Sequence, residues 1–250
     1  MTTRHWAPGN YRYVPGVFQY SAGVVADAGH AIERIRFPDP VPWRQGFDRI
    51  RAYLSERGRP LTAFCACEMR SPEPFSEGGF VTFNEAYARV LAEWGLLENS
   101  DNPVARSNVC PEFDPPGEPA FHAFAFTVPT ADAGQSFIVA GGAEAPEGKG
   151  GYADHIIAKG DLSPEGLKTK AAYVMDEMTR RLQALGADWS GTSAVQTYTV
   201  HDIHAFLPDV LVARGAARHG LTWHYARPPV VDLEFEMDCR RITVERLLIT

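Results

Sequence analysis

The chain has 250 residues, of which 45% are hydrophobic and 22% are charged, and its formal net charge at pH 7 is −7. This composition is typical of a folded globular protein and argues against an intrinsically disordered chain. The acidic balance, with no run of more than two basic residues, argues against a nucleic acid or an anionic membrane as partner and favours a small molecule or a protein.

The N-terminal segment, Met1 to Gly9, has no apolar stretch, so we expect no signal peptide. No run of about 18 apolar residues occurs, so we expect no membrane-spanning helix. The four cysteines are too few for a disulfide framework: Cys65, Cys67, Cys110 and Cys239. These features predict a cytoplasmic protein with reduced thiols.

The first half of the chain predicts the order β-β-α-β-α-β-β, beginning with a strand over 18–25. Apolar residues at helical spacing from Pro42 lead to Gly58, which suits a left-handed helix cap. A β-like run over 61–70 follows, and an extended segment begins at Ala105-Arg106. A second helix between them is marked by Phe80, Phe83, Tyr87, Leu91 and Trp94.

The same order returns in the second half. Ser163 and Pro164 suit the start of a helix that ends at Gly186. A β-like run over 192–201, a second helix over 206–217 and an extended segment at Ala226-Arg227 follow. We therefore predict an α/β (α+β) protein with two tandem domains, over residues 1–130 and 131–250, joined by a linker at Pro129 to Asp132. Each domain is expected to be a mixed β-sheet backed by two helices.

The order of these motifs resembles the reactive-intermediate deaminase (Rid, or YjgF-like) superfamily. Ser21-Ala22-Gly23-Val24 resembles its Ser-Gly-Gln turn, and Phe83-Asn84-Glu85-Ala86-Tyr87 resembles its Phe-x-x-Asn-x-x-Tyr helix. Pro103 to Val109 resembles its Pro-Ala-Arg-Ser segment, with one residue inserted. The second half keeps an arginine, Arg227, but loses the serine and the asparagine helix.

The resemblance implies a chorismate-mutase-like sheet backed by two helices and ligand clefts between the subunits of a trimer. For a fused pair of domains we expect a homotrimer. In that family the arginine holds a substrate carboxylate, and a downstream carboxylate positions the water that hydrolyses an imine or enamine. No cofactor is implied.

Arg106 is the strongest candidate for catalysis, because a guanidinium is a planar donor fork that binds carboxylate with two hydrogen bonds. The alternative is a structural salt bridge. Ser107, Asn108 and Cys110 follow on the same extended run, and Asn108 and Cys110 share a face with Arg106. We expect these three, and Gly23 in the Ser21 turn, to contact the substrate.

The strand after the next hairpin departs from the family pattern, because Ala120 to Phe126 contains no glutamate. His122 is its only ionisable side chain, and Glu118 lies just ahead of it. Both are candidates for the proton transfer. The alternative for His122 is a hydrogen-bonded histidine in the core.

The second half offers another candidate site, in which Arg227 anchors a ligand beside Glu234 or Glu236. Solvated or ion-paired acids are the alternative. Cys65 and Cys67 do not have the spacing of a zinc site, so no metal is expected. The glycine-rich stretch Gly148 to Gly151 lacks the spacing of a nucleotide-binding loop and is interpreted as a loop that could line a cleft.

These residues predict a hydrolytic deaminase of an imine or enamine, such as a 2-aminomuconate-like or 2-aminoacrylate-like acid from aromatic compound degradation. Arginine would hold the carboxylate while water attacks the C=N carbon and releases ammonia. One alternative is a non-catalytic module that binds small metabolites or proteins. Another is a hydrolase of a cyclic amide on the same fold.

Overall fold

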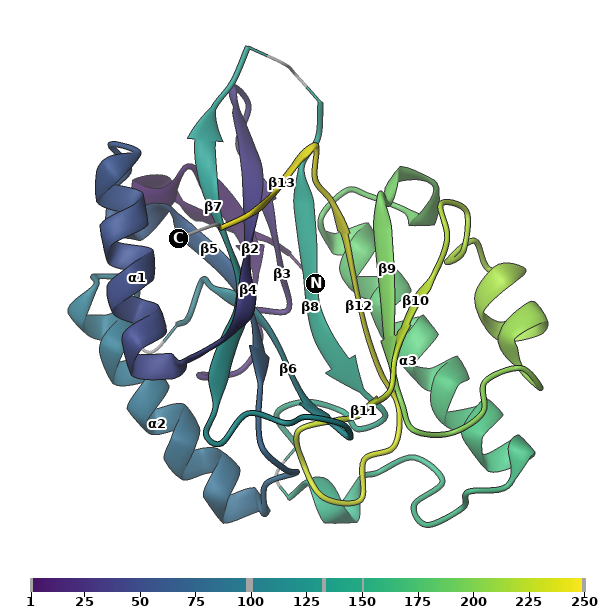
Figure 1. Ribbon diagram of the computed structural model, residues 1–250. Coiled ribbons are helices and arrows are strands. Elements are labelled where there is room, and N and C mark those ends of the chain that lie inside the picture. Colours follow the sequence, from purple (N-terminus) through teal and green to yellow (C-terminus); the bar gives the residue numbers. More distant parts are fainter. Residues whose placement is uncertain (1, 98–100, 132–133, 150, 249–250) are drawn as a thin grey trace.

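The computed structural model describes residues 2–97, 101–131, 134–149 and 151–248. Asp132 of the expected linker and Gly150 of the expected loop lie outside these residues. The fold is a mixed α/β arrangement in which two β-sheets face each other (Figure 1). Helices α1 (Trp43–Glu56) and α2 (Glu77–Glu93) cover the outer face of one sheet, and α3 (Pro164–Ala184) covers the outer face of the other (Figure 1).

The three helices form where helical spacing and capping residues predict them. The side chain of Ser76 accepts a hydrogen bond from Gly79 N at the start of α2, and Ser163 does the same for Gly166 N in α3. Such caps satisfy amide groups that have no partner within the helix. The predictions of these three helices are confirmed.

One sheet has six strands, in the order β11-β6-β5-β7-β4-β13, and the other has seven, in the order β1-β2-β3-β8-β12-β9-β10. The first sheet is built from β4 (His30–Pro42), β5 (Phe64–Arg70), β6 (Ala105–Pro111), β7 (Ala120–Pro129), β11 (Ala226–Arg227) and β13 (Val244–Leu247). The second is built from β1 (Arg4–Trp6), β2 (Tyr11–Val14), β3 (Gly23–Ala26), β8 (Phe137–Ala143), β9 (Ala194–Tyr198), β10 (Thr222–His224) and β12 (Glu236–Arg241).

Four strands of each sheet are arranged alike. The order β6-β5-β7-β4 in the first sheet corresponds to β10-β9-β12-β8 in the second. In each set the first pair is parallel and the other two pairs are antiparallel. This agrees with the element order predicted for both halves. However, β1 to β3 join the sheet of the second half, and β11 and β13 join that of the first. The division into domains at residue 130 stays a prediction.

The prediction of a second helix over residues 206–217 is wrong. Only Leu207–Val212 forms a helical segment, with π-type hydrogen bonding, and turns follow it. Gly215 has a φ of 94°, which a right-handed helix does not accommodate. The second sheet is therefore backed by one long helix.

Apolar cores lie between each sheet and its helices. In the first, Phe47 of α1 packs edge-on against Trp94 and Phe121, with ring centroids 5.0 Å apart in each pair. In the second, Val174 and Met178 of α3 pack on the seven-stranded sheet. These contacts stabilise the fold mainly by removing apolar surface from water.

The contact between the two sheets is polar by comparison. Ser107 of β6 donates a 2.6 Å hydrogen bond to Asp238 of β12. Arg240 of β12, itself buried, donates a 2.7 Å hydrogen bond to Glu245 of β13. Buried polar groups of this kind hold a defined geometry, because an unpaired one is costly. The active-site candidate lies at one side of this contact.

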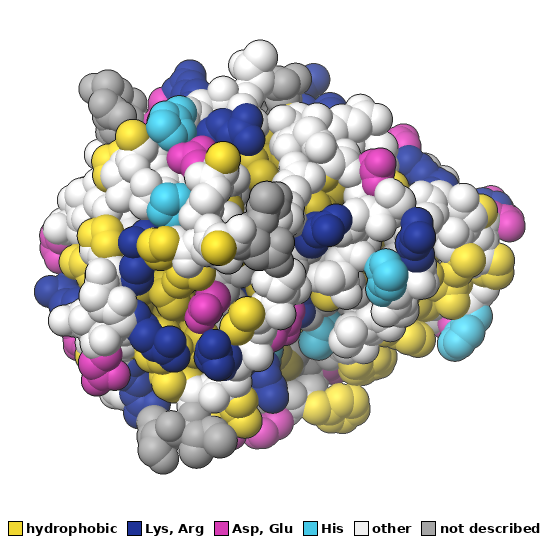
Figure 2. Space-filling view, turned by 90° about the horizontal axis from the view of Figure 1, so that it is seen from above, with side chains coloured by type: hydrophobic (Ala, Val, Ile, Leu, Met, Phe, Trp, Pro, Cys, Tyr) yellow, Lys and Arg dark blue, Asp and Glu magenta, His cyan; other side chains and the backbone are white. Residues whose placement is uncertain are grey.

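Basic and acidic side chains are mixed on the outer surface. In the face seen in Figure 2, basic and acidic side chains are interspersed with apolar ones. Among the described residues, no helix is long and apolar enough to cross a membrane.

Candidate active site

A pocket lies where β6 of the six-stranded sheet meets β8 and β12 of the seven-stranded sheet. Its empty volume is about 450 Å³, including the open mouth. Chain segments from both sheets and from α2 contribute to its wall. Its polar lining residues are Tyr20, Arg106, Asn108, Glu147, Tyr152 and Glu236, and its apolar ones include Phe80, Ala143, Val230 and Leu233.

Arg106 is a cation in a buried position. Its Nη2 donates a 2.6 Å hydrogen bond to Asn84 Oδ1, whereas Nη1 has no hydrogen-bond partner. No carboxylate of the described residues forms an ion pair with it. The guanidinium instead lies over the rings of Tyr87, at 4.7 Å, and Tyr20, at 5.4 Å. Cation–π contacts offset part of the cost of burying this charge. An anionic ligand on Nη1 would complete the site.

Asn108 supplies a second free donor. It stands two residues after Arg106 on β6, and side chains alternate along a strand, so both face the same side. Its Oδ1 accepts a 3.0 Å hydrogen bond from Ser71, which fixes the amide orientation. Its Nδ2 is buried and has no partner. Arg106 and Asn108 thus both line the pocket, and each has one N–H group without a partner among the described residues, which suits the binding of a carboxylate.

Glu236 of β12 supplies the acidic group. Burial, and then repulsion from Asp238, raise the pKa of its carboxyl well above the ordinary range. Within the described chain, no hydrogen bond reaches this carboxyl. Gly141 makes room for it, because a Cβ there would lie 2.2 Å from Glu236 Oε1. A carboxyl that keeps its proton at unusually high pH can act as a general acid.

A third group lies on the loop after β8. Glu147 Oε1 accepts hydrogen bonds from the Tyr20 hydroxyl, at 2.8 Å, and from Arg181 Nη2, at 2.9 Å. Arg181 is itself fixed by the carbonyl oxygens of Ala140 and Gly141. Burial, and then the charge of Glu147, raise the pKa of Tyr152 to about 12. Tyr152 therefore keeps its hydroxyl proton at neutral pH.

Three of the residues predicted from sequence come together in this pocket: Arg106, Asn108 and Glu236. Ser107 does not line it, because its side chain faces the opposite way and binds Asp238. Cys110 is also absent from the lining, and burial raises the pKa of its thiol to about 12. Gly23 packs near Leu185, which follows α3, and a Cβ on Gly23 would lie 3.1 Å from Leu185 Cδ1.

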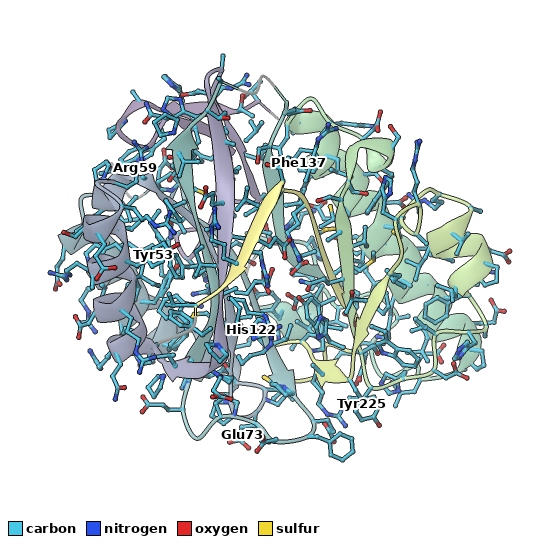
Figure 3. The ribbon with its side chains drawn as sticks, turned by 45° about the horizontal axis from the view of Figure 1, so that its top comes forward. Tyr53, Arg59, Glu73, His122, Phe137 and Tyr225 are labelled. Atoms are coloured by element: carbon cyan, nitrogen blue, oxygen red, sulfur yellow. The ribbon has the colours of Figure 1, made fainter. Side chains whose placement is uncertain are left out.

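The predictions that His122 and Glu118 act beside Arg106 need correction. His122 is half-buried on β7 (Figure 3), and its partial burial and then the charge of Arg70 lower its pKa to about 3. It is kept neutral among arginines and does not line the pocket. Glu118 lies in the exposed turn before β7 and lines a separate surface groove with Asp114.

The second site expected around Arg227 is not formed either. Arg227 is partly exposed and donates a 2.9 Å hydrogen bond to Glu112. It therefore forms a salt bridge at the surface. Tyr225, two residues earlier, lies at the rim of the molecule (Figure 3) and stacks on Phe113. Glu236 faces the pocket of Arg106 instead. Cys67 contacts the Tyr87 hydroxyl, and no group of metal-binding side chains occurs within the described ranges.

Sequence reasoning missed Tyr20, Asn84, Glu147 and Tyr152 as site residues. Asn84 did carry a signal, since it stands in the helix motif that resembles the Rid pattern. Tyr20 and Glu147 come from connecting segments and Tyr152 from a short 3-10 helix (Tyr152–Asp154), and only the folded chain brings them together. No spacing in the sequence indicates that contact.

Three comparisons place the chain among known proteins. Residues 3–246 match the family described as 2-aminomuconate deaminase CnbZ. The chain is 47% identical over 245 residues to 2-amino-5-chloromuconate deaminase of Comamonas testosteroni, covering 97% of this chain and 98% of that protein. A crystal structure of chorismatase matches with a TM-score of 0.53 at 11% identity, covering 90% of this chain and 78% of that one. The last likeness concerns the fold alone.

Proposed function

The chain belongs to the family of 2-aminomuconate deaminase CnbZ and is thus an enzyme that acts on C–N bonds, and we propose a substrate for it. This substrate is 2-aminomuconate or a chain-substituted relative such as 2-amino-5-chloromuconate, which the enzyme hydrolyses. The products would be the corresponding 2-oxo dicarboxylic acid and ammonia. The observation that carries this proposal is the buried Arg106, whose Nη1 has no partner inside a pocket that also holds Glu236.

Substrate binding would begin with a carboxylate on Arg106. Nη1 and the Nδ2 of Asn108 supply two donors, and the aromatic rings around the guanidinium exclude water from it. In this low-dielectric setting a charged hydrogen bond contributes more than it does in water. The apolar wall of Phe80, Val230 and Leu233 would contact the carbon chain.

Glu236 would carry the protons. Its protonated carboxyl gives a proton to a carbon of the enamine, and the double bond shifts to form an iminium ion. Water adds to the C=N carbon and returns a proton to the Glu236 carboxylate, which leaves a carbinolamine. Glu236 then protonates the nitrogen, the C–N bond breaks, and the hydroxyl proton goes back to Glu236 as the carbonyl forms. One water is consumed and one ammonia is released.

Coupled measurement of ammonia release from 2-aminomuconate tests the proposal. We expect turnover by the wild-type protein and a fall of about 10- to 100-fold in kcat/KM for Arg106→Met, since a charged hydrogen bond is worth about 1.5–3 kcal/mol. Arg227→Met is the matched control and should keep wild-type activity. Equal activity in Arg106→Met and wild type would overturn the role of Arg106.

The assembly stays a proposal as well. We propose that the two-domain chain, which resembles the Rid superfamily in its motifs, forms a homotrimer and works in the cytoplasm on a small carboxylate. Sedimentation of the purified chain tests the trimer, because a monomer at all concentrations would contradict it.

A further inference from the structure

The pocket has an acidic pole as well as a basic one. Arg106 and Asn108 supply donors on one side, and Glu147 supplies a carboxylate on another. Tyr20 connects the two, because its ring lies 5.4 Å from the Arg106 guanidinium and its hydroxyl donates to Glu147 at 2.8 Å. One tyrosine side chain therefore separates the two charges.

Glu147 is held in place but not saturated. Tyr20 and Arg181 both donate their hydrogen bonds to Oε1. Among the residues that the structure describes, none donates to Oε2. A carboxylate oxygen accepts more than one hydrogen bond. The second oxygen is therefore available to an N–H donor in the pocket.

We infer that Glu147 binds the amino group of the substrate while Arg106 binds the adjacent carboxylate, so that the pocket selects a 2-amino acid over the 2-oxo acid. This inference deepens the proposed function and rests on it. The amino group offers N–H donors to Glu147, whereas a carbonyl oxygen is only an acceptor and would be repelled by the carboxylate. Hydrolysis replaces the favoured group by the disfavoured one, which promotes release of the product.

The contact would also strengthen during the reaction. The nitrogen is neutral in the enamine, becomes positive in the iminium ion, and is positive again as it leaves. A fixed carboxylate next to a developing positive charge stabilises the transition state more than the ground state. Glu147 would thus affect kcat as well as binding.

Two unreactive six-carbon probes test the selection without turnover: 2-aminoadipate and 2-oxoadipate. Calorimetry gives a dissociation constant for each, and we expect the wild type to bind the amino compound more tightly. In Glu147→Gln the amide can donate to the carbonyl oxygen, so the preference for the amino compound should fall by about 10- to 100-fold. General damage to the pocket would weaken both probes and leave their ratio unchanged.

Glu177→Gln is the matched control. Glu177 accepts a 2.9 Å hydrogen bond from the Nε of Arg181 but does not line the pocket. This variant should keep the wild-type ratio. A wild type that binds both probes equally or neither, or a Glu147→Gln variant with the wild-type ratio, would overturn the inference.

The two proposals fail separately. If the wild type released no ammonia from 2-aminomuconate, the proposed function would fall, and the ratio of the two dissociation constants would still decide the role of Glu147. If ammonia were released and the ratio did not change in Glu147→Gln, only the inference about Glu147 would fall.

Discussion

Arg106 donates one hydrogen bond to Asn84, from Nη2 to Oδ1 at 2.6 Å, and keeps Nη1 free for a ligand. A neutral amide holds the guanidinium in place without cancelling its charge. A carboxylate at the same position would hold the guanidinium and also neutralise its charge. The choice of asparagine on α2 therefore keeps the pocket cationic.

Asn84→Asp tests this relationship with a change of almost no volume. The new carboxylate would pair with Arg106 and compete with the substrate carboxylate. We expect KM for 2-aminomuconate to rise by about 10- to 100-fold, as the loss of a charged hydrogen bond implies. Steady-state kinetics of ammonia release measures it. An unchanged KM, with the thermal stability also unchanged, would show that Arg106 does not meet the substrate.

Glu236→Gln removes the proposed proton donor while keeping the shape of the side chain. We expect kcat to fall by about 100-fold or more, within the range attributed to general acid–base catalysis. The pH profile adds a signed prediction. Burial and Asp238 raise the pKa of Glu236, so its protonated form persists to a higher pH than that of an exposed carboxyl, and kcat of the wild type should fall as the pH rises through that raised pKa. A residual activity in Glu236→Gln that keeps this alkaline limb would assign the limb to another group.

Gly141→Ala places a methyl group where Glu236 now lies, since the added Cβ would be 2.2 Å from Oε1. The carboxyl would have to move, and we expect activity to fall by about 10-fold or more, because small displacements of a catalytic group are costly. Gly117→Ala is the control, because no atom lies within 4 Å of a Cβ at that position. If both variants kept full activity, the position of Glu236 against Gly141 would not matter for catalysis.

The sequence allowed the three long helices to be predicted and pointed to Arg106, which lines the pocket, because both rest on local signals. Helical spacing with Ser-Pro at its start marks α3, and the segment around Arg106 carries a short motif. That Arg106 and Glu236 line the same pocket could not be predicted from the sequence. These residues come from different halves of the chain, and only the contact of β6 with β8 and β12 brings them together.

The acid group was misplaced for the same reason. His122 and Glu118 follow the hairpin after β6, where the family pattern expects a carboxylate. However, β7 turns His122 toward Arg70 and away from the pocket. Strands β1 to β3 join the sheet of the second half, and β11 and β13 join that of the first. The local hydrophobic pattern does not predict this, because the pairing of strands that are distant in sequence is decided by packing.

Two half-buried histidines predict how stability depends on pH. Burial lowers the pKa of His122 to about 3 and that of His224 to about 4, from an ordinary 6.5. The unfolded chain therefore binds more protons than the folded one below about pH 6.5, and the free energy of unfolding falls as the pH drops from there toward 3. Stability from these groups is complete above that range.

Urea unfolding at several pH values checks this expectation. His122→Gln should show a smaller loss of unfolding free energy between pH 6.5 and pH 4 than the wild type. His204→Gln is the control, because His204 is exposed, with 74% of its side chain accessible. An identical decline in His122→Gln and wild type would show that His122 titrates normally in the folded state.

The most direct measurement is a crystal structure of the protein soaked with cis,cis-muconate, the six-carbon dicarboxylate that lacks the reactive amino group. We predict one carboxylate of the ligand within hydrogen-bond distance of Arg106 Nη1 and Asn108 Nδ2, with the carbon chain next to Glu236. A ligand bound at Arg227, or a muconate that leaves Arg106 without an anion, would contradict the account.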